Sequence, residues 1–282
     1  MSGRVAAALA AVLLLVAAPS AAGVRPVVDR SETAHLSGWT VTLAYRLERH
    51  DGFEKLVQLH LSTSAEGGGR LDRVLPIPKE CGSLGCVVFG GSGSLLEVRD
   101  LDGRAPTALV WLWTGGAHCC SLVEAVPVAG GRVAQHDFGN HGASVARIGS
   151  VGLFSSVDDR FSYLYTSFAA SLNPLQLWRL RGGRFVDVTA SYRGRIAADA
   201  QRLWAFVRGQ AKQRGEARGA FAAWAADACR LSGWGRVARA AAPLVASGVF
   251  SPPRTDSFGP TGKRFPPVLR RDLTRFGYCR RG

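Results

Sequence analysis

The residues best suited to chemistry in this chain form a short run, His118-Cys119-Cys120, which follows two glycines. Thiolate sulfur and imidazole nitrogen are ligands that zinc prefers, and a thiolate beside a base is also a nucleophile. Neighbouring residues of a strand point to opposite faces, so His118 and Cys120 can share a face whereas Cys119 cannot. His136 and His141, in "QHDFGNHG", would complete a thiol or metal site if the chain turned back toward this run.

A disulfide framework is the alternative for the same sulfur atoms. The chain has six cysteines, and an even number favours full pairing in an exported protein. They are Cys81, Cys86, Cys119, Cys120, Cys229 and Cys279. We expect the first two to cross-link with the next two, in either order, and Cys229 to pair with Cys279. A direct Cys119–Cys120 bond closes a strained eight-membered ring and is the disfavoured topology. The sequence favours structural disulfides over a metal site or a reactive thiol.

A hydrolytic site would need a base held by an orienting carboxylate, and His136, Asp137 and His141 offer these groups. No G-x-S-x-G elbow, H-E-x-x-H motif or spaced carboxylate pair accompanies them. We therefore assign no catalytic residue and expect a solvated loop. A hydrolase or a thiol- or metal-dependent enzyme that uses this region together with His118-Cys119-Cys120 is kept as the alternative.

The segment "DLDGRAPTALV", residues 100–110, has the form of a calcium loop that leads into a strand. Calcium requires six to eight oxygen ligands, commonly from acidic side chains at alternate positions of a loop that contains glycine. Asp100 and Asp102 fit this pattern, but Arg104 occupies the next alternate position. We expect an Asp-Gly turn, with weak calcium binding as the one cofactor hypothesis.

Two stretches carry a resemblance to a known class of protein. "DLDGRAPTALVWLWTGGAHCC" and "FSYLYTSFAASLNPLQLWRLRGGRFVDVTASY" resemble bacterial exported proteins similar to FG-GAP or VCBS repeat proteins, the blade type of integrin-like β-propellers. The resemblance covers about residues 95–192. It implies a β-blade architecture and a binding or adhesive role, and it names no ligand.

An internal repeat agrees with that architecture. Residues 109–133 align without a gap with residues 161–185, and the alignment matches two Gly-Gly-Arg turns. Each unit is predicted to be a strand, a loop, a strand and a Gly-Gly turn into another strand. The alternating aromatic residues of these strands are expected to be core, although they would also suit a carbohydrate-binding face.

The elements that position these residues fall into two parts. Short apolar or alternating runs between Gly and Asn-Pro breaks predict a hairpin of two strands over residues 41–62, joined near Asp51-Gly52, and single strands over 108–114, 122–128, 161–168 and 175–180. After Tyr192, apolar residues at helical spacing predict three helices that end near Gly215, Gly233 and Gly248, and then a loop and a last short helix or turn. The fold class is therefore α+β: a β-rich domain over residues 35–192 with two blade-like antiparallel units, followed by a small helical domain over residues 193–282.

Charge and the N-terminus indicate a location and a partner. Residues 1–22 resemble a cleavable signal peptide, and no later segment is apolar and long enough to span a membrane. Residues 193–282 contain 18 Lys and Arg against 5 Asp and Glu, whereas the preceding part is close to neutral. A basic end on a neutral body suggests contact with an anionic envelope polymer or with lipid headgroups, and nucleic acid is disfavoured for an exported chain.

These observations lead to one functional hypothesis and two alternatives. We expect a non-catalytic binding module that is secreted or held at the cell envelope, with a carbohydrate or protein as a further ligand. The alternatives are the enzyme described above and a purely structural envelope protein.

Overall fold

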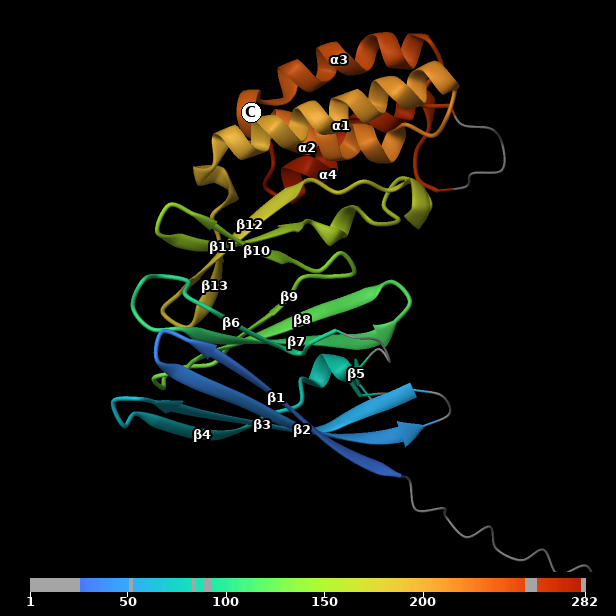
Figure 1. Ribbon diagram of the computed structural model, residues 1–282. Coiled ribbons are helices and arrows are strands. Elements are labelled where there is room, and N and C mark those ends of the chain that lie inside the picture. The colour runs from blue at the N-terminus through green and yellow to red at the C-terminus, as the bar shows by residue number, and fades with distance from the viewer. Residues whose placement is uncertain (1–25, 51–52, 83–84, 89–92, 252–257, 280–282) are drawn as a thin grey trace, which may run out of the picture.

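The computed structural model describes residues 26–50, 53–82, 85–88, 93–251 and 258–279. The predicted signal peptide, residues 1–22, lies outside the described residues. In the described part, three antiparallel β layers and a group of helices are stacked in chain order along one long axis (Figure 1).

Each β layer is a four-stranded antiparallel meander. The first contains β1 (Val27–Leu36), β2 (Trp39–His50), β3 (Phe53–Ala65) and β4 (Arg70–Leu75). The second contains β6 (Leu96–Arg99), β7 (Thr107–Gly116), β8 (Cys119–Pro127) and β9 (Ala134–Asp137). The third contains β10 (Ser144–Ile148), β11 (Val151–Val157), β12 (Leu175–Arg181) and β13 (Arg184–Asp187). The short strand β5 (Val87–Val88) pairs with β3 and β7, so the first two layers form one hydrogen-bonded sheet.

The second layer is buried on both faces, as the side chains of β8 show. Leu122 and Val126 pack into the core shared with the first layer, whereas Val123 and Ala125 pack into the core shared with the third. This division follows from the two-residue period of a strand. The apolar side chains of this strand therefore pack against both neighbouring layers.

Three features of the predicted β-rich domain need correction. The structure contains three blade-like meanders rather than two, because the predicted hairpin over residues 41–62 is the centre of a meander of its own. The first strand begins at Val27, before the predicted domain start at residue 35. The strand predicted over residues 161–168 is wrong, because Tyr163 has a φ of 62°, in the left-handed region, between two 3₁₀ turns.

The aromatic residues of that segment pack against the helices instead of forming a strand. Phe161 and Tyr165 are buried in the helical core, and the Tyr165 hydroxyl donates a hydrogen bond of 3.1 Å to Asp272 Oδ2. The two repeat segments consequently agree only in their second halves. There, Gly130-Gly131 and Gly182-Gly183 occupy equivalent positions between consecutive strands.

The helical part follows the sequence prediction closely. The helices are α1 (Arg193–Gln213), α2 (Arg218–Ser232), α3 (Trp234–Ala246) and α4 (Phe265–Arg275). The 3₁₀ turns are η1 (Lys79–Cys81), η2 (Asp159–Phe161), η3 (Phe168–Ala170), η4 (Thr189–Ser191) and η5 (Gly262–Arg264). The first three helices end beside the predicted glycines, since a residue with positive φ is a common helix terminator. Within the described residues, none of the helices has both the length and the apolar character required to cross a membrane.

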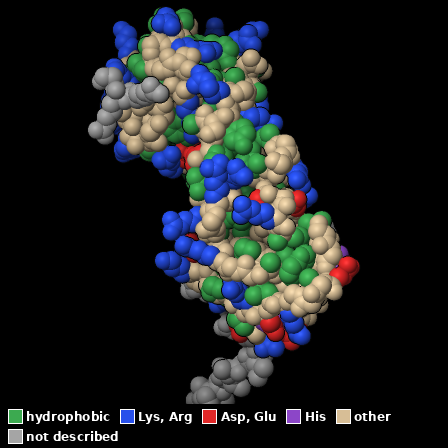
Figure 2. Space-filling view, turned by 90° about the vertical axis from the view of Figure 1, so that its left-hand side faces the viewer, with side chains coloured by type: hydrophobic (Ala, Val, Ile, Leu, Met, Phe, Trp, Pro, Cys, Tyr) green, Lys and Arg blue, Asp and Glu red, His purple; other side chains and the backbone are tan. Residues whose placement is uncertain are grey.

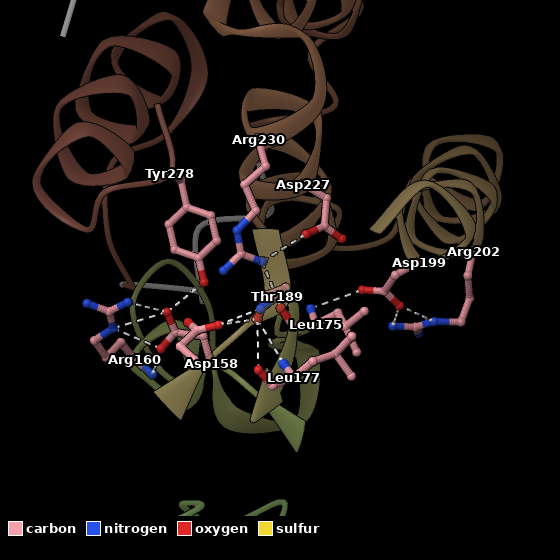
Figure 3. A network of polar contacts seen from close by, with 11 residues as sticks. Asp158, Arg160, Leu175, Leu177, Thr189, Asp199, Arg202, Asp227, Arg230 and Tyr278 are labelled. Atoms are coloured by element: carbon pink, nitrogen blue, oxygen red, sulfur yellow. Dashed lines mark hydrogen bonds and ion pairs between the residues drawn. The ribbon is translucent and has the colours of Figure 1, made fainter. Parts of the chain in front are cut away.

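A network of polar contacts joins the helices to the third layer (Figure 3). The Tyr278 hydroxyl donates a 2.7 Å hydrogen bond to Asp158 Oδ2, and Arg230 Nη1 donates a 2.7 Å hydrogen bond to the Leu175 carbonyl. The Leu175 amide in turn donates to Asp199 Oδ2 over 3.1 Å. Because Asp158 is almost fully buried, these contacts satisfy groups that would otherwise be costly to remove from water.

Candidate functional site

A pocket of about 600 Å³ lies where β9 of the second layer meets β11, β12 and β13 of the third. Its polar lining is mostly acidic and consists of His136, Asp137, Asp158, Asp159, Arg160, Gln176 and Asp187. Phe138, Trp178 and Cys120 also contribute to its wall. The pocket therefore combines several carboxylates with the surfaces of aromatic rings.

His136 forms part of the aromatic wall. Its ring centroid lies 4.0 Å from that of Trp178 and 4.5 Å from that of Phe138, and its ring stacks on Phe185 at 5.3 Å. Burial lowers the pKa of His136 to about 4, against a smaller opposing effect of Asp187. The imidazole is consequently neutral near pH 7, and its ring adds an aromatic surface to the pocket.

The acidic residues of the pocket are held by local hydrogen bonds. Desolvation raises the pKa of Asp137 although its side chain reaches the surface, and the charges of Asp159 and Glu80 add to this effect. The Gly139 amide donates a hydrogen bond of 2.8 Å to Asp137 Oδ1, and this bond acts in the opposite direction, to lower the pKa of Asp137. For Asp158, burial would raise the pKa, but hydrogen bonds from Arg160 and Tyr278 prevail and lower it.

A cluster of rings continues from the pocket across the surface. His141 Nδ1 lies 3.0 Å from Asp159 Oδ1, and the His141 ring stacks on Phe168 with centroids 6.0 Å apart. Phe168 also contacts His118 at 4.2 Å and Tyr163 at 5.3 Å. The left-handed backbone of Tyr163 holds its ring partly exposed in this cluster. Strained backbone of this kind often accompanies a functional surface.

The four residues of the predicted thiol or metal site lie in one region but do not converge as ligands. Among the described residues, one set of three His, Cys, Asp or Glu side chains brings its ligand atoms within 4.8 Å of one another, namely Cys119, Cys120 and Asp137. That set contains no histidine. His118 and His141 instead pack on Phe168, and His136 packs on Trp178.

The disulfide topology differs from the predicted one in the β-rich part. Cys81 pairs with Cys86, and Cys119 pairs with Cys120, so the predicted cross-links between these two pairs are wrong. Cys81 ends η1 and Cys86 precedes β5, and their Cα atoms are 4.7 Å apart, which lets them close their own short loop. Cys229 and Cys279 pair as the sequence predicts and tie α2 to the segment after α4.

The carboxylates proposed for calcium are engaged in a turn. Asp100 Oδ1 accepts a 2.6 Å hydrogen bond from the Gly103 amide, and its Oδ2 lies 3.2 Å from Arg147 Nη1. Asp102 Oδ1 accepts from the Arg104 amide over 3.1 Å. These contacts are typical of an Asp-Gly turn, and calcium binding at these two residues stays a prediction.

Sequence analysis did not identify the third-layer side of the pocket. Asp158, Asp159 and Arg160 follow directly after β11, and Trp178 and Asp187 lie on the β12–β13 hairpin. The run Asp158-Asp159-Arg160 at the end of an apolar strand was a usable signal, because polar groups at strand ends often line sites. Its contact with residues 136–141 depends on the stacking of two layers, which the local sequence does not encode.

Comparisons with known proteins extend to part of the chain. A probable thylakoid lumen protein of Synechocystis sp. is 29% identical over 166 residues. The aligned region covers 53% of this chain and 43% of that protein, so the match spans less than half of the relative's length. No family model matches the sequence, and no solved structure matches it.

Proposed function

We propose that the protein is an exported, non-catalytic binding module whose helical end attaches to an anionic surface of the cell envelope. The lumen location in the relative's name supports an exported compartment. Paired cysteines support the same compartment, since disulfides persist outside the reducing cytosol. The stack of four-stranded meanders supports the blade-like architecture that the FG-GAP/VCBS resemblance implies.

The observation that carries this proposal is the set of exposed cations on the helical part. Within the described residues, ten exposed Lys and Arg side chains of this part form no ion pair: Arg193, Arg195, Arg208, Lys212, Arg214, Arg236, Arg239, Lys263, Arg264 and Arg270. Figure 2 displays many Lys and Arg side chains over the helical end at the top of the molecule. Because these cations have no acidic partner, their positive charge can attract an anionic surface. Each such side chain contributes about 1 kcal/mol to the free energy of binding at an anionic lipid surface.

Sedimentation with vesicles tests the attachment. The full mature chain should co-sediment with phosphatidylglycerol-containing vesicles at low salt and should be released at 1 M salt, where the Debye length falls to about 3 Å. Reversing two charges on α3, Arg236→Glu with Arg239→Glu, should weaken binding by at least about tenfold. The matched control reverses Arg181 and Arg184 on the β12–β13 hairpin and should leave binding nearly unchanged.

Other outcomes would change the proposal in defined ways. Binding to an anionic polysaccharide but not to anionic vesicles would assign the surface to a polymer rather than to lipid. Equal loss of binding in the α3 and β12–β13 variants would mean that net charge, not the helical end, determines attachment. Retention that persists at 1 M salt, or no retention at all, would refute the electrostatic attachment.

The pocket supports a second binding activity, toward a ligand rich in hydroxyl groups such as a carbohydrate. Carboxylates accept hydrogen bonds from hydroxyls, and the ring of Trp178 offers an apolar face to a sugar. Titration of envelope oligosaccharides against tryptophan fluorescence tests this activity, with Gln176→Ala and Trp178→Phe as pocket variants. The Arg181/Arg184 charge-reversal variant serves as the control that keeps the pocket. Saturable quenching that the two pocket variants do not alter would place the ligand elsewhere.

A further inference from the structure

The β7–β8 hairpin holds the two adjacent cysteines in a fixed position. The strand register is interrupted between Trp113 and Gly116, and Gly116 faces Cys119 across the turn. A Cβ added at Gly116 would lie 2.9 Å from the Cys119 carbonyl oxygen, so this close approach requires glycine. Thr114 Oγ1 accepts a 2.7 Å hydrogen bond from the Cys120 amide. The hairpin therefore positions both sulfur atoms through its backbone.

Strand pairing brings Asp137 to the same point. Asp137 ends β9 and pairs in register with Leu122 of β8. Beyond that pair, the Ser121 amide donates to the Gly139 carbonyl over 2.7 Å, which keeps the two segments together past the end of the strand. Asp137 Oδ1 accepts from the Gly139 amide, which fixes the orientation of the carboxylate. Its ligand oxygen and the sulfur atoms of both cysteines lie within 4.8 Å of one another.

We propose that the reduced thiolates of Cys119 and Cys120, together with the Asp137 carboxylate, bind one thiophilic divalent metal ion of the zinc class, and that the Cys119–Cys120 disulfide closes this site. Zinc binds thiolate sulfur at about 2.3 Å and carboxylate oxygen at about 2.0–2.2 Å, so the two sulfurs, which are bonded to each other in the disulfide, must separate on reduction, and Asp137 lies near enough to complete the set. Two thiolates favour such an ion over calcium or magnesium. The inference is independent of the proposed attachment to an anionic surface.

The surroundings of the three ligands favour an open metal site. Cys120 and Asp137 both line the pocket, so a fourth coordination position would face it and be accessible to water or to a ligand. Sites with three protein ligands and one open position are typical of reactive zinc centres, whereas structural sites use four. Asp159 and Glu80 interact electrostatically with Asp137, and their negative charges attract a cation to this point.

Reduction opens the site by ordinary thiol–disulfide exchange. A small dithiol attacks the Cys119–Cys120 bond, supplies two electrons and two protons, and leaves as its own cyclic disulfide, while the two cysteine sulfurs become thiols. Metal binding then displaces the two thiol protons, because the thiolate is the ligand. In the oxidised protein neither sulfur is available as a thiolate.

Cadmium titration tests the proposal on the full mature chain. After reduction with dithiothreitol and removal of the reductant without oxygen, the protein should bind one Cd²⁺ with sulfur-to-metal charge-transfer absorption. The air-oxidised protein should not bind it. Asp137→Asn, a substitution at an exposed residue, should weaken Cd²⁺ binding by about tenfold or more. Cys119→Ser with Cys120→Ser should abolish the absorption band.

The matched control removes the other dithiol of the β-rich part. Cys81→Ser with Cys86→Ser should retain the cadmium signal and its sensitivity to Asp137→Asn. Cadmium binding that survives loss of Cys119 and Cys120, or an affinity that Asp137→Asn leaves unchanged, would overturn the proposal. If the Cys119/Cys120 variant does not fold, the Asp137→Asn titration still decides, because that residue distinguishes this site from the other cysteine pairs. Absence of binding to the reduced protein would also overturn it.

Discussion

Replacement of Glu124 by glutamine should change how the stability of the protein depends on pH. Glu124 lies on β8, is 1% exposed, and its Oε2 atom has no hydrogen-bond partner in the described part of the chain. Burial raises the pKa of Glu124 from 4.5 to about 7. The folded state therefore keeps a proton that the unfolded state has released between these two values. The contribution of this bound proton to the free energy of unfolding is fully present below pH 4.5. It is lost as the pH rises to 7, which lowers the free energy of unfolding by about 3 kcal/mol for a shift of this size.

Urea unfolding of the wild type and Glu124→Gln between pH 4 and 8.5 measures this effect. The difference between their free energies of unfolding should change by about 3 kcal/mol, in favour of the variant at the alkaline end, and should level off above pH 7. Glu66→Gln, at an exposed residue, is the control and should follow the wild type in parallel. A difference that stays constant from pH 4 to pH 8.5 would refute the assignment of a buried, proton-binding Glu124.

Three further variants test how the parts are held together, each by urea unfolding against the wild type. Cys229→Ser with Cys279→Ser opens a loop of sequence separation 50 and should cost about 4 kcal/mol, whereas a loss near zero would contradict the pairing. Tyr278→Phe removes a hydroxyl that donates to a buried carboxylate and should cost about 2 kcal/mol, and an unchanged midpoint would mean that this contact does not join the helices to the third layer. Gly139→Ala should cost about 2 kcal/mol or more, because φ is +66° and the added Cβ would lie 2.6 Å from the Asp159 side chain; a neutral effect would show that the two segments do not approach so closely.

The parts of the fold that were predictable are those with local signals. Helix ends at Gly233 and Gly248 follow from glycine's ability to adopt positive φ, and the hairpins around Gly130 and Gly182 follow from turn chemistry. The apolar runs over residues 108–114, 122–128 and 175–180 also predicted strands that the structure contains as β7, β8 and β12. In each case, the residues that determine the element lie within that element.

The segment 161–168 shows why the remaining structure was not predictable. Its alternation of aromatic and polar residues is typical of a strand, yet Phe161 and Tyr165 are buried against helices that occur later in the sequence. Burial against a distant helix overrides local strand propensity. The disulfide pairing has the same origin, since the partner of Cys81 depends on the path of a loop rather than on the spacing of cysteines.

The candidate site depends on Gly139, a residue whose missing side chain cannot itself bind a ligand. Asp137 belongs to the second layer and Asp159 to the third, and the loop after β9 must lie against η2 to bring them to one pocket. Gly139 permits this contact, because its φ of 66° and its missing side chain let the loop pass beside Asp159. Its amide donates to Asp137, and the next amide along, that of Asn140, donates to Asp159 over 3.4 Å. The acidic pocket and the Cys119–Cys120–Asp137 cluster therefore both depend on the same turn of backbone, and a change at this glycine should disturb them together.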